Sequence, residues 1–460
     1  MFYENILYAS GLAQVYKKSS SNLVIMEADM NKDKEQEILF DLLKKAVTPF
    51  DCVKAGMERL KSEGFDEINY ADDWTLERGG KYVINHHDTT LFAFTVGVDY
   101  KQGDMVRIAA AHTDYPTLRI KPNADFKTDV YSQINVEVYG GPILNTWFDR
   151  PLGVAGRVVV RSKNPFKPDV RFYKSDKPLV VIPNLAIHMN PEINKGVEIN
   201  RQIDLMPIVD MLPEEEKSCD YFLSFLAEEL AVDKKDILDF ELMTYCMEEP
   251  QYVGVKDTMI SAARLDNQTS CAALLSAIID GGRKNGVNLI ALFDHEEVGS
   301  SSKQGAASIL LHDMYRRIIR SLGASEEEID RSMYDAMMLS VDVAHGLHPN
   351  KQGKMDITNH PVLGRGFCIK EACSQSYATD SEAIAILCQI CDADDIPYQR
   401  FVNRSDIRGG STLGSIASTL LPVKTVDIGI PLLSMHSVRE LMGAADQKAL
   451  KDAVTAFFKA

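Results

Sequence analysis

Hydrophobic and polar positions follow different patterns along the chain, and the first region mixes helical with strand spacing. Apolar residues recur with the spacing of a helix face over residues 34–46 and 50–64. Residues 81–97 then alternate as the two strands of a hairpin do. Residues 105–112 form a short apolar run that ends in His112. Such a run predicts a buried strand that leads into a site.

The second region carries many short β-like segments separated by Pro, Gly and Asn turns. Examples are residues 134–141, 155–162, 170–174 and 178–185. This change of pattern predicts a separate β-rich unit over residues 116–254.

The third region alternates again between helix and strand patterns. The predicted helices cover residues 269–282 and 307–323, and apolar strands are predicted at residues 287–294, 336–342 and 423–429. Alternation of this kind is typical of a mostly parallel sheet covered by helices.

A chain of 460 residues is too long for one ordinary compact core. We therefore expect an α/β catalytic domain built from residues 1–115 and 255–460. A β-rich insertion, residues 116–254, would interrupt it.

Charge and composition exclude several classes of partner. The formal net charge is -16, and no run of five basic residues occurs, so nucleic acid is not an expected partner. No stretch approaches eighteen uninterrupted apolar residues, and the start lacks the pattern of a signal peptide. We expect a soluble cytoplasmic protein without a membrane segment.

The cysteines lack the regular spacing of a secreted disulfide framework. Eight cysteines in so long a chain fit a reducing compartment. Cys388 and Cys391 could join Cys368 and Cys373 in a structural zinc site, but the apolar residues around the first pair favour a buried helix face.

Residues that can bind metal or move protons follow the predicted strands. His112 is followed by Asp114, whose carboxylate could orient the imidazole. Asp266 stands directly before an apolar helix, where it could bridge two cations. An aspartate at that place is also a common N-cap, and taken alone the N-cap is the favoured interpretation.

The most informative cluster is the pair Glu296 and Glu297 after the strand predicted at residues 287–294. Adjacent side chains diverge, so one glutamate can bind a metal while the other takes a proton from water. Asp342 and His436 lie in two further polar clusters. Together the clusters supply nitrogen and oxygen ligands suited to zinc, with manganese or cobalt as alternatives.

These clusters, with residues 145–152 (NTWFDRPL) between the first two, resemble the aspartyl aminopeptidase family of dinuclear zinc peptidases over nearly the whole chain. The resemblance implies a zinc aminopeptidase that removes single N-terminal residues from peptides, with two zinc ions per subunit. In that layout Asp266 bridges both ions, His112 and Asp342 complete one site, and Glu297 and His436 complete the other. Glu296 is the implied general base, and Asp114 supports His112.

The resemblance also implies features outside the metal ligands. Lys370 and His345 are candidates for binding an acidic substrate side chain, although residues 405–412 depart from the acid-preferring pattern, so a preference for neutral residues such as leucine stays open. The β-rich insertion would pair subunits in a homododecamer. His188 would reach into the active site of a neighbouring subunit.

Two other functions remain to be separated from this one. A related dinuclear zinc carboxypeptidase or deacylase would share the same ligands, and substrates with free and acetylated N-termini would distinguish it. A catalytically silent scaffold is disfavoured because every matched ligand and both glutamates are present.

Overall fold

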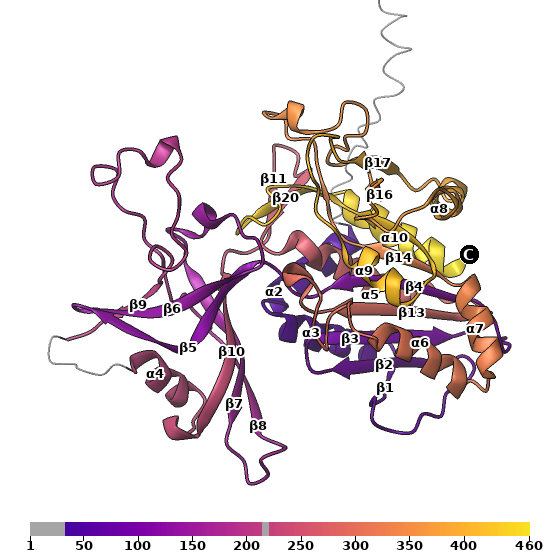
Figure 1. Ribbon diagram of the computed structural model, residues 1–460, viewed down its shortest axis with the longest axis horizontal. Helices are drawn as coiled ribbons and strands as arrows, with labels where there is room; N and C mark the ends of the chain where they lie inside the picture. Colours follow the sequence, from indigo (N-terminus) through magenta and orange to yellow (C-terminus); the bar gives the residue numbers. More distant parts are fainter. Residues whose placement is uncertain (1–32, 214–219) are drawn as a thin grey trace, which may run out of the picture. The chain divides into compact units, whose positions relative to one another are not determined.

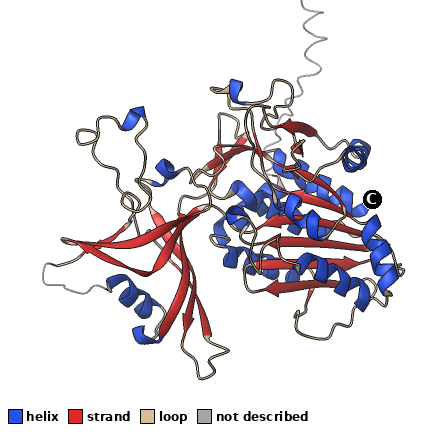
Figure 2. Cartoon of the chain, viewed as in Figure 1, coloured by secondary structure: helices blue, strands red, loops and turns tan. Residues whose placement is uncertain are grey.

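The structure is a computed structural model that describes residues 33–213 and 220–460. Residues 35–460 form one compact unit, and all features discussed below lie within it. Three sheets organise this unit (Figures 1 and 2). Among the described residues, no helix combines the length and the apolar character needed to cross a membrane.

The largest sheet has nine strands, most of them paired in parallel. The pairs β2–β3, β3–β13 and β16–β18 are antiparallel. The expected α/β fold with a mostly parallel sheet is therefore confirmed. In spatial order the strands are β1 (Asp66–Glu67), β2 (Lys81–His86), β3 (Thr90–Val96), β13 (Val287–Phe293), β4 (Val106–His112), β14 (Met337–Val341), β18 (Lys424–Gly429), β16 (Phe367–Glu371) and β17 (Tyr398–Val402).

Helices cover both faces of this sheet, as Figure 2 shows. Alternation along β4 explains why: Ile108 and Ala110 belong to one core, whereas Ala109 and Ala111 belong to the other. The face of Ala109 packs against α2 (Lys34–Lys45), α3 (Pro49–Ser62), α5 (Leu265–Asp280), α8 (Ser381–Ala393) and α10 (Asp446–Lys459). The face of Ile108 packs against α6 (Leu310–Ser321), α7 (Glu326–Asp335) and α9 (Leu413–Leu420).

The second sheet has six antiparallel strands, all drawn from residues 117–246. Its own apolar core includes residues of α4 (Tyr221–Glu229). In spatial order the strands are β8 (Asp169–Lys174), β7 (Leu152–Val160), β10 (Ile237–Cys246), β5 (Thr117–Thr128), β6 (Tyr131–Tyr139) and β9 (Ile208–Met211).

One predicted strand of this region does not form. Residues 178–185 make only isolated bridges, at Val180 and Val181. Pro178 and Pro183 lack backbone N–H groups and therefore cannot donate to a ladder.

The third sheet has five short strands, drawn from residues 251–262, 344–345 and 431–443. In spatial order its strands are β11 (Gln251–Val253), β12 (Met259–Ala262), β20 (Glu440–Gly443), β19 (Pro431–Leu433) and β15 (Ala344–His345). Five short 3-10 helices complete the described residues: η2 (Leu144–Trp147), η3 (Ile193–Lys195), η4 (Lys234–Asp236), η5 (Glu296–Val298) and η6 (Gln352–Lys354).

Candidate metal centre

The parallel core of the large sheet brings the predicted polar clusters to one edge. Strand β4 lies between β13 and β14 and is parallel to both, with His112 opposite Phe293. The carboxyl ends of the three strands therefore meet at one edge, where open α/β sheets place their sites. Glu296 and Glu297 follow β13, and Asp342 follows β14.

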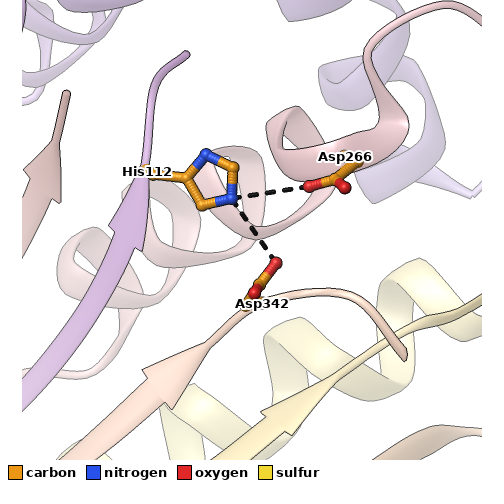
Figure 3. A group of neighbouring side chains, drawn as sticks. All are labelled: His112, Asp266 and Asp342. Carbon is orange, nitrogen blue, oxygen red and sulfur yellow. Dashed lines mark ion pairs between the residues drawn. The ribbon is translucent and has the colours of Figure 1, made fainter. Parts of the chain in front are cut away.

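His112 faces two carboxylates through one ring nitrogen and is buried, with 1% of its side chain exposed. Its Nε2 atom lies 3.4 Å from Oδ1 of Asp266 and 3.5 Å from Oδ1 of Asp342 (Figure 3). Its Nδ1 atom lies 3.1 Å from the carbonyl oxygen of Asp114 and 3.3 Å from that residue's Oδ1. Asp114 thus favours the tautomer that leaves Nε2 free to bind a cation.

His436 makes the corresponding contacts with the other oxygen of Asp266. Its Nε2 atom lies 3.3 Å from Oδ2 of Asp266 and 3.5 Å from Oε2 of Glu297. Asp266 therefore presents one oxygen to each histidine. This arrangement suits a bridging carboxylate. Asp266 is the second residue of α5 and Arg264 is its N-cap, so the N-cap interpretation of Asp266 was wrong.

The donor atoms lie close enough together to hold cations. His112 groups with Asp266 and Asp342, and Asp266 also groups with Glu297 and His436, each set lying within 4.8 Å. Buried oxygens of Asp266 (Oδ1) and Glu297 (Oε1) have no hydrogen-bond partner. Because buried acceptors normally find a donor, these two atoms fit a bound metal ion. Imidazole nitrogens and carboxylate oxygens are the ligands that zinc accepts.

The negative charges of the site also raise the pKa values of its two histidines. Burial alone would lower the pKa of His112, but its contacts with the carboxylates of Asp114 and Asp266 raise it well above its ordinary value. Burial also lowers the pKa of His436, but the contact with Asp266 acts in the opposite direction and the pKa rises to about 10. The same carboxylates would stabilise a metal cation bound at this place.

Glu296 lies in the same cluster as His112 and Glu297. Both glutamates belong to η5, which begins after a left-handed turn at His295. Burial raises the pKa of Glu296 to about 8, with His112 opposing the increase and the carboxylate of Asp342 adding to it. A carboxyl group with a pKa near neutrality is suited to accept and release a proton.

Two buried side chains that sequence reasoning missed hold the ligands in place. Glu440 accepts the backbone N–H of Asp266 at 3.0 Å and that of His436 at 2.8 Å. Tyr139 donates its hydroxyl to Oδ2 of Asp114 at 2.7 Å. Glu440 lies four residues after His436, in the polar cluster already identified from the sequence. Nothing in the sequence around Tyr139 indicated a role at the site.

Asp114 also connects the two strand ends. Its two carboxylate oxygens accept the backbone N–H groups of Glu296 and Glu297, each at 3.1 Å. A single buried carboxylate therefore fixes both the ring of His112 and the start of η5.

The predicted substrate-binding residues differ in exposure. Lys370 is buried, and its ammonium donates to the carbonyl oxygens of Asp342 at 2.9 Å and Val343 at 3.1 Å. His345 is exposed, and its ring packs against Phe401 at a centroid distance of 6.0 Å. His188 is exposed in a turn of the segment between β8 and β9.

The four cysteines considered as a structural zinc site lie apart from the candidate metal ligands. Cys368 and Cys391 are buried, Cys388 is half-buried on α8, and Cys373 is exposed. Among residues 33–213 and 220–460, no group of candidate metal ligands includes a cysteine. Cys388 and Cys391 both lie on α8, with Cys391 buried, as the interpretation of this segment as a helix expects.

The edge of this α/β sheet brings together imidazoles and carboxylates that can bind metal, with Glu296 beside them as a candidate base. Such an arrangement is typical of metal-dependent hydrolases. Comparison with known proteins is more specific. The model of the family "Aminopeptidase I zinc metalloprotease (M18)" matches residues 42–458. The chain therefore belongs to the M18 family of zinc aminopeptidases, which confirms the resemblance seen in the sequence.

Individual relatives support the same family. A probable M18 family aminopeptidase 2 of Clostridium novyi (strain NT) is 44% identical over 417 residues, which cover 90% of this chain and 96% of that protein. The solved structure of an Ape4 and Nbr1 complex matches with a TM-score of 0.88 and 33% identity over 92% of this chain and 85% of that chain. A Saccharomyces mApe1 dodecamer, 24% identical, shares the fold with a TM-score of 0.78, covering 93% of this chain and 96% of that chain.

Proposed function

We propose that this zinc aminopeptidase removes single N-terminal residues with two zinc ions per subunit. Asp266 would bridge the ions, His112 and Asp342 would hold one, and Glu297 and His436 would hold the other. The observation that carries this proposal is that the two oxygens of Asp266 face different histidines. Manganese and cobalt are the alternative metals for the same ligands.

Glu296 is the general base of the proposed reaction. Bound zinc supplies Lewis acidity that polarises the scissile carbonyl group. Glu296 takes the proton from the attacking water and passes it to the departing amine. Asp114 keeps the ring of His112 in the tautomer required for metal binding.

The proposal is tested with matched peptides that carry a free or an acetylated N-terminus. An aminopeptidase requires the free amine, so the acetylated peptide should resist hydrolysis and a chelator should stop hydrolysis of the free one. Equal rates on both peptides would assign the centre to a deacylase or another peptidase. Elemental analysis should find two zinc ions per chain.

For the side chain of the removed residue, we propose a preference for aspartate and glutamate. In support, the ammonium of Lys370 donates to the carbonyl oxygen of Asp342. The exposed His345 follows Asp342 by three residues. The alternative is a neutral residue such as leucine, which is favoured by the engagement of Lys370 with two carbonyl oxygens. Naphthylamides of Asp, Glu and Leu separate the two preferences.

We also propose that the region of the six-stranded sheet, residues 116–254, is an oligomerisation domain that builds a homododecamer. In support, large apolar side chains are exposed in its segment between β8 and β9, including Leu185, Ile187, Met189 and Ile203. The dodecamer of the Saccharomyces protein, which has the same fold, gives the expected stoichiometry.

The assembly is tested by light scattering on Met189→Glu, which should release smaller species. Tyr334→Glu, at an exposed position on α7, is the matched control and should stay assembled. We propose that His188, next to Met189, enters the active site of a neighbouring subunit. His188→Ala should then lower activity without changing the mass of the particle.

A cytoplasmic location is the remaining part of the proposal. The cysteines of the described residues are free thiols, as expected in a reducing compartment. Cell fractionation with an antibody against the protein tests the location.

A further inference from the structure

The end of strand β6 leads from the six-stranded sheet to the metal centre. Residues 139–143 connect Tyr139, the last residue of β6, with η2. Although this segment contributes none of the proposed ligands, it contacts residues on both sides of the bridging Asp266. Its contacts therefore need an explanation beyond linking two elements.

Tyr139 acts on the side of His112. Its side chain is buried at 7% exposure, and its hydroxyl donates to Asp114 at 2.7 Å. Asp114 in turn faces Nδ1 of His112 at 3.3 Å and accepts the N–H groups that open η5. The hydroxyl thus helps to fix the carboxylate that orients a proposed ligand.

The next residues act on the side of His436. The carbonyl oxygen of Gly141 lies 3.1 Å from Nδ1 of His436. The backbone N–H of Ile143 donates to the carbonyl oxygen of His436 at 2.8 Å. The ring and the backbone of this histidine are therefore both held by the same short segment.

Gly140 packs against a third proposed ligand. Its φ is +72°, and a Cβ atom added there would lie 3.1 Å from Cβ of Glu297 and 3.4 Å from its Oε2. A larger residue would meet both an unfavourable backbone conformation and a neighbour at very short range. Glycine therefore lets the segment pass close to Glu297 without backbone strain or displacement of that side chain.

We propose that residues 139–143 are positioning residues of the metal centre, so that the six-stranded sheet takes part in metal binding and catalysis. This inference rests on the ligand roles proposed above. Partners that orient metal ligands typically change metal affinity about 10- to 100-fold when they are removed. The segment should therefore matter for zinc affinity as well as for folding.

The experiment compares two variants with two matched controls. Tyr139→Phe removes only the hydroxyl, and Tyr131→Phe makes the same change at the exposed start of β6. Gly140→Ala presses on Glu297, whereas Gly64→Ala has a similar φ of +82° with nothing within 4 Å. Both glycine changes carry the same kind of backbone strain, and only one reaches the site.

Each full-length protein is stripped of metal and titrated with zinc against a chromophoric chelator. The visible spectrum of the cobalt-substituted form reports ligand geometry, and thermal unfolding of the metal-free form reports stability. Tyr139→Phe and Gly140→Ala should each bind at least one zinc ion about tenfold more weakly and shift the cobalt spectrum. The two controls should match the unaltered protein in both respects.

The outcomes separate the inference from the function on which it rests. An unaltered protein that binds fewer than two zinc ions would overturn the proposed ligand set. Two ions bound with unchanged affinity and spectrum in both variants would overturn the inference, even if the variants unfold at lower temperature. If Tyr139→Phe does not fold, the glycine pair decides.

Discussion

The two histidines of the centre occupy different surroundings. His112 ends a central strand and has 1% of its side chain exposed, whereas His436 lies in a loop with 31% exposed. Asp266 faces both. The half with His112 and Asp342 is closed, and the half with His436 and Glu297 is open on the histidine side.

The support behind each half differs in kind. The closed half is backed by side chains, with Asp114 against the ring of His112 and Lys370 against the carbonyl of Asp342. In the open half the ring of His436 faces a backbone group, the carbonyl oxygen of Gly141, and the side chains of Glu440 and Asp114 hold only the backbone N–H groups of His436 and Glu297. We therefore predict that the two proposed metal ions differ in affinity and in exchange rate.

Loss of the carboxylate that both halves share should abolish metal binding in both. Asp266→Asn removes the negative charge that both halves use, so zinc should fall below one ion per chain. Because the metal supplies several kcal/mol of catalysis, kcat/KM should fall at least about a thousandfold. Elemental analysis and steady-state kinetics measure both, and Asp99→Asn, at an exposed position, should change neither. Retention of two ions and full activity would refute the bridge.

Removal of the proposed base should leave both halves intact. Glu296→Gln keeps the size of the side chain but cannot accept a proton, so kcat should fall about 10²- to 10⁴-fold with zinc content unchanged. Parallel assays of kcat and bound zinc test this, with Glu327→Gln on the exposed face of α7 as the control. Normal turnover in Glu296→Gln would assign the base to another residue.

Chelation should distinguish the two halves directly. The ion of the open half should leave first, and the second should leave roughly tenfold more slowly because its ligands are buried and braced by side chains. Stopped-flow release of zinc to a fluorescent chelator should therefore show two phases. A single phase that releases both ions would show that the difference in exposure has no effect on exchange.

A change behind the closed half should have the smallest effect on metal binding. Lys370→Met removes the donor to the carbonyl of Asp342 and should weaken only the slowly released ion, by a few-fold to about tenfold. It also breaks the buried ion pair of Lys370 with Asp342, whose Nζ and Oδ2 atoms lie 3.9 Å apart, which should lower the free energy of unfolding of the metal-free protein by about 3 kcal/mol. Chelator kinetics and urea unfolding measure the two effects, with the exposed Lys101→Met as control. An altered fast phase would contradict the division into halves.

Features of the fold that depend on neighbouring residues could be predicted from the sequence. Apolar runs ending in polar clusters predicted β4, β13 and β14, because a strand buried on both faces leaves a local pattern. The structure brings His112, Asp266 and Asp342 together as one candidate group of metal ligands. Their roles as metal ligands remain predictions.

Features that depend on distant contacts could not be predicted in this way. The local rule for Asp266 favoured an N-cap, because the opposing histidines come from segments far along the chain. The residues around Tyr139 show only the pattern of a strand, and its hydrogen bond with Asp114 joins residues that are 25 positions apart. The two prolines in residues 178–185 outweighed the apolar pattern that predicted a strand there.

The pairing of β4 with β13 and β14 has a consequence for synthesis. Strand β4 leaves the ribosome before residues 117–246, whereas both of its neighbours in the sheet follow them. The six-stranded sheet can therefore fold while β4 still has open edges, and long-range pairing of this kind is slow. The proposed set of metal ligands is complete only after residue 436 has emerged. The nascent chain must keep an apolar strand out of aggregates until then, which makes this protein a candidate for chaperone dependence.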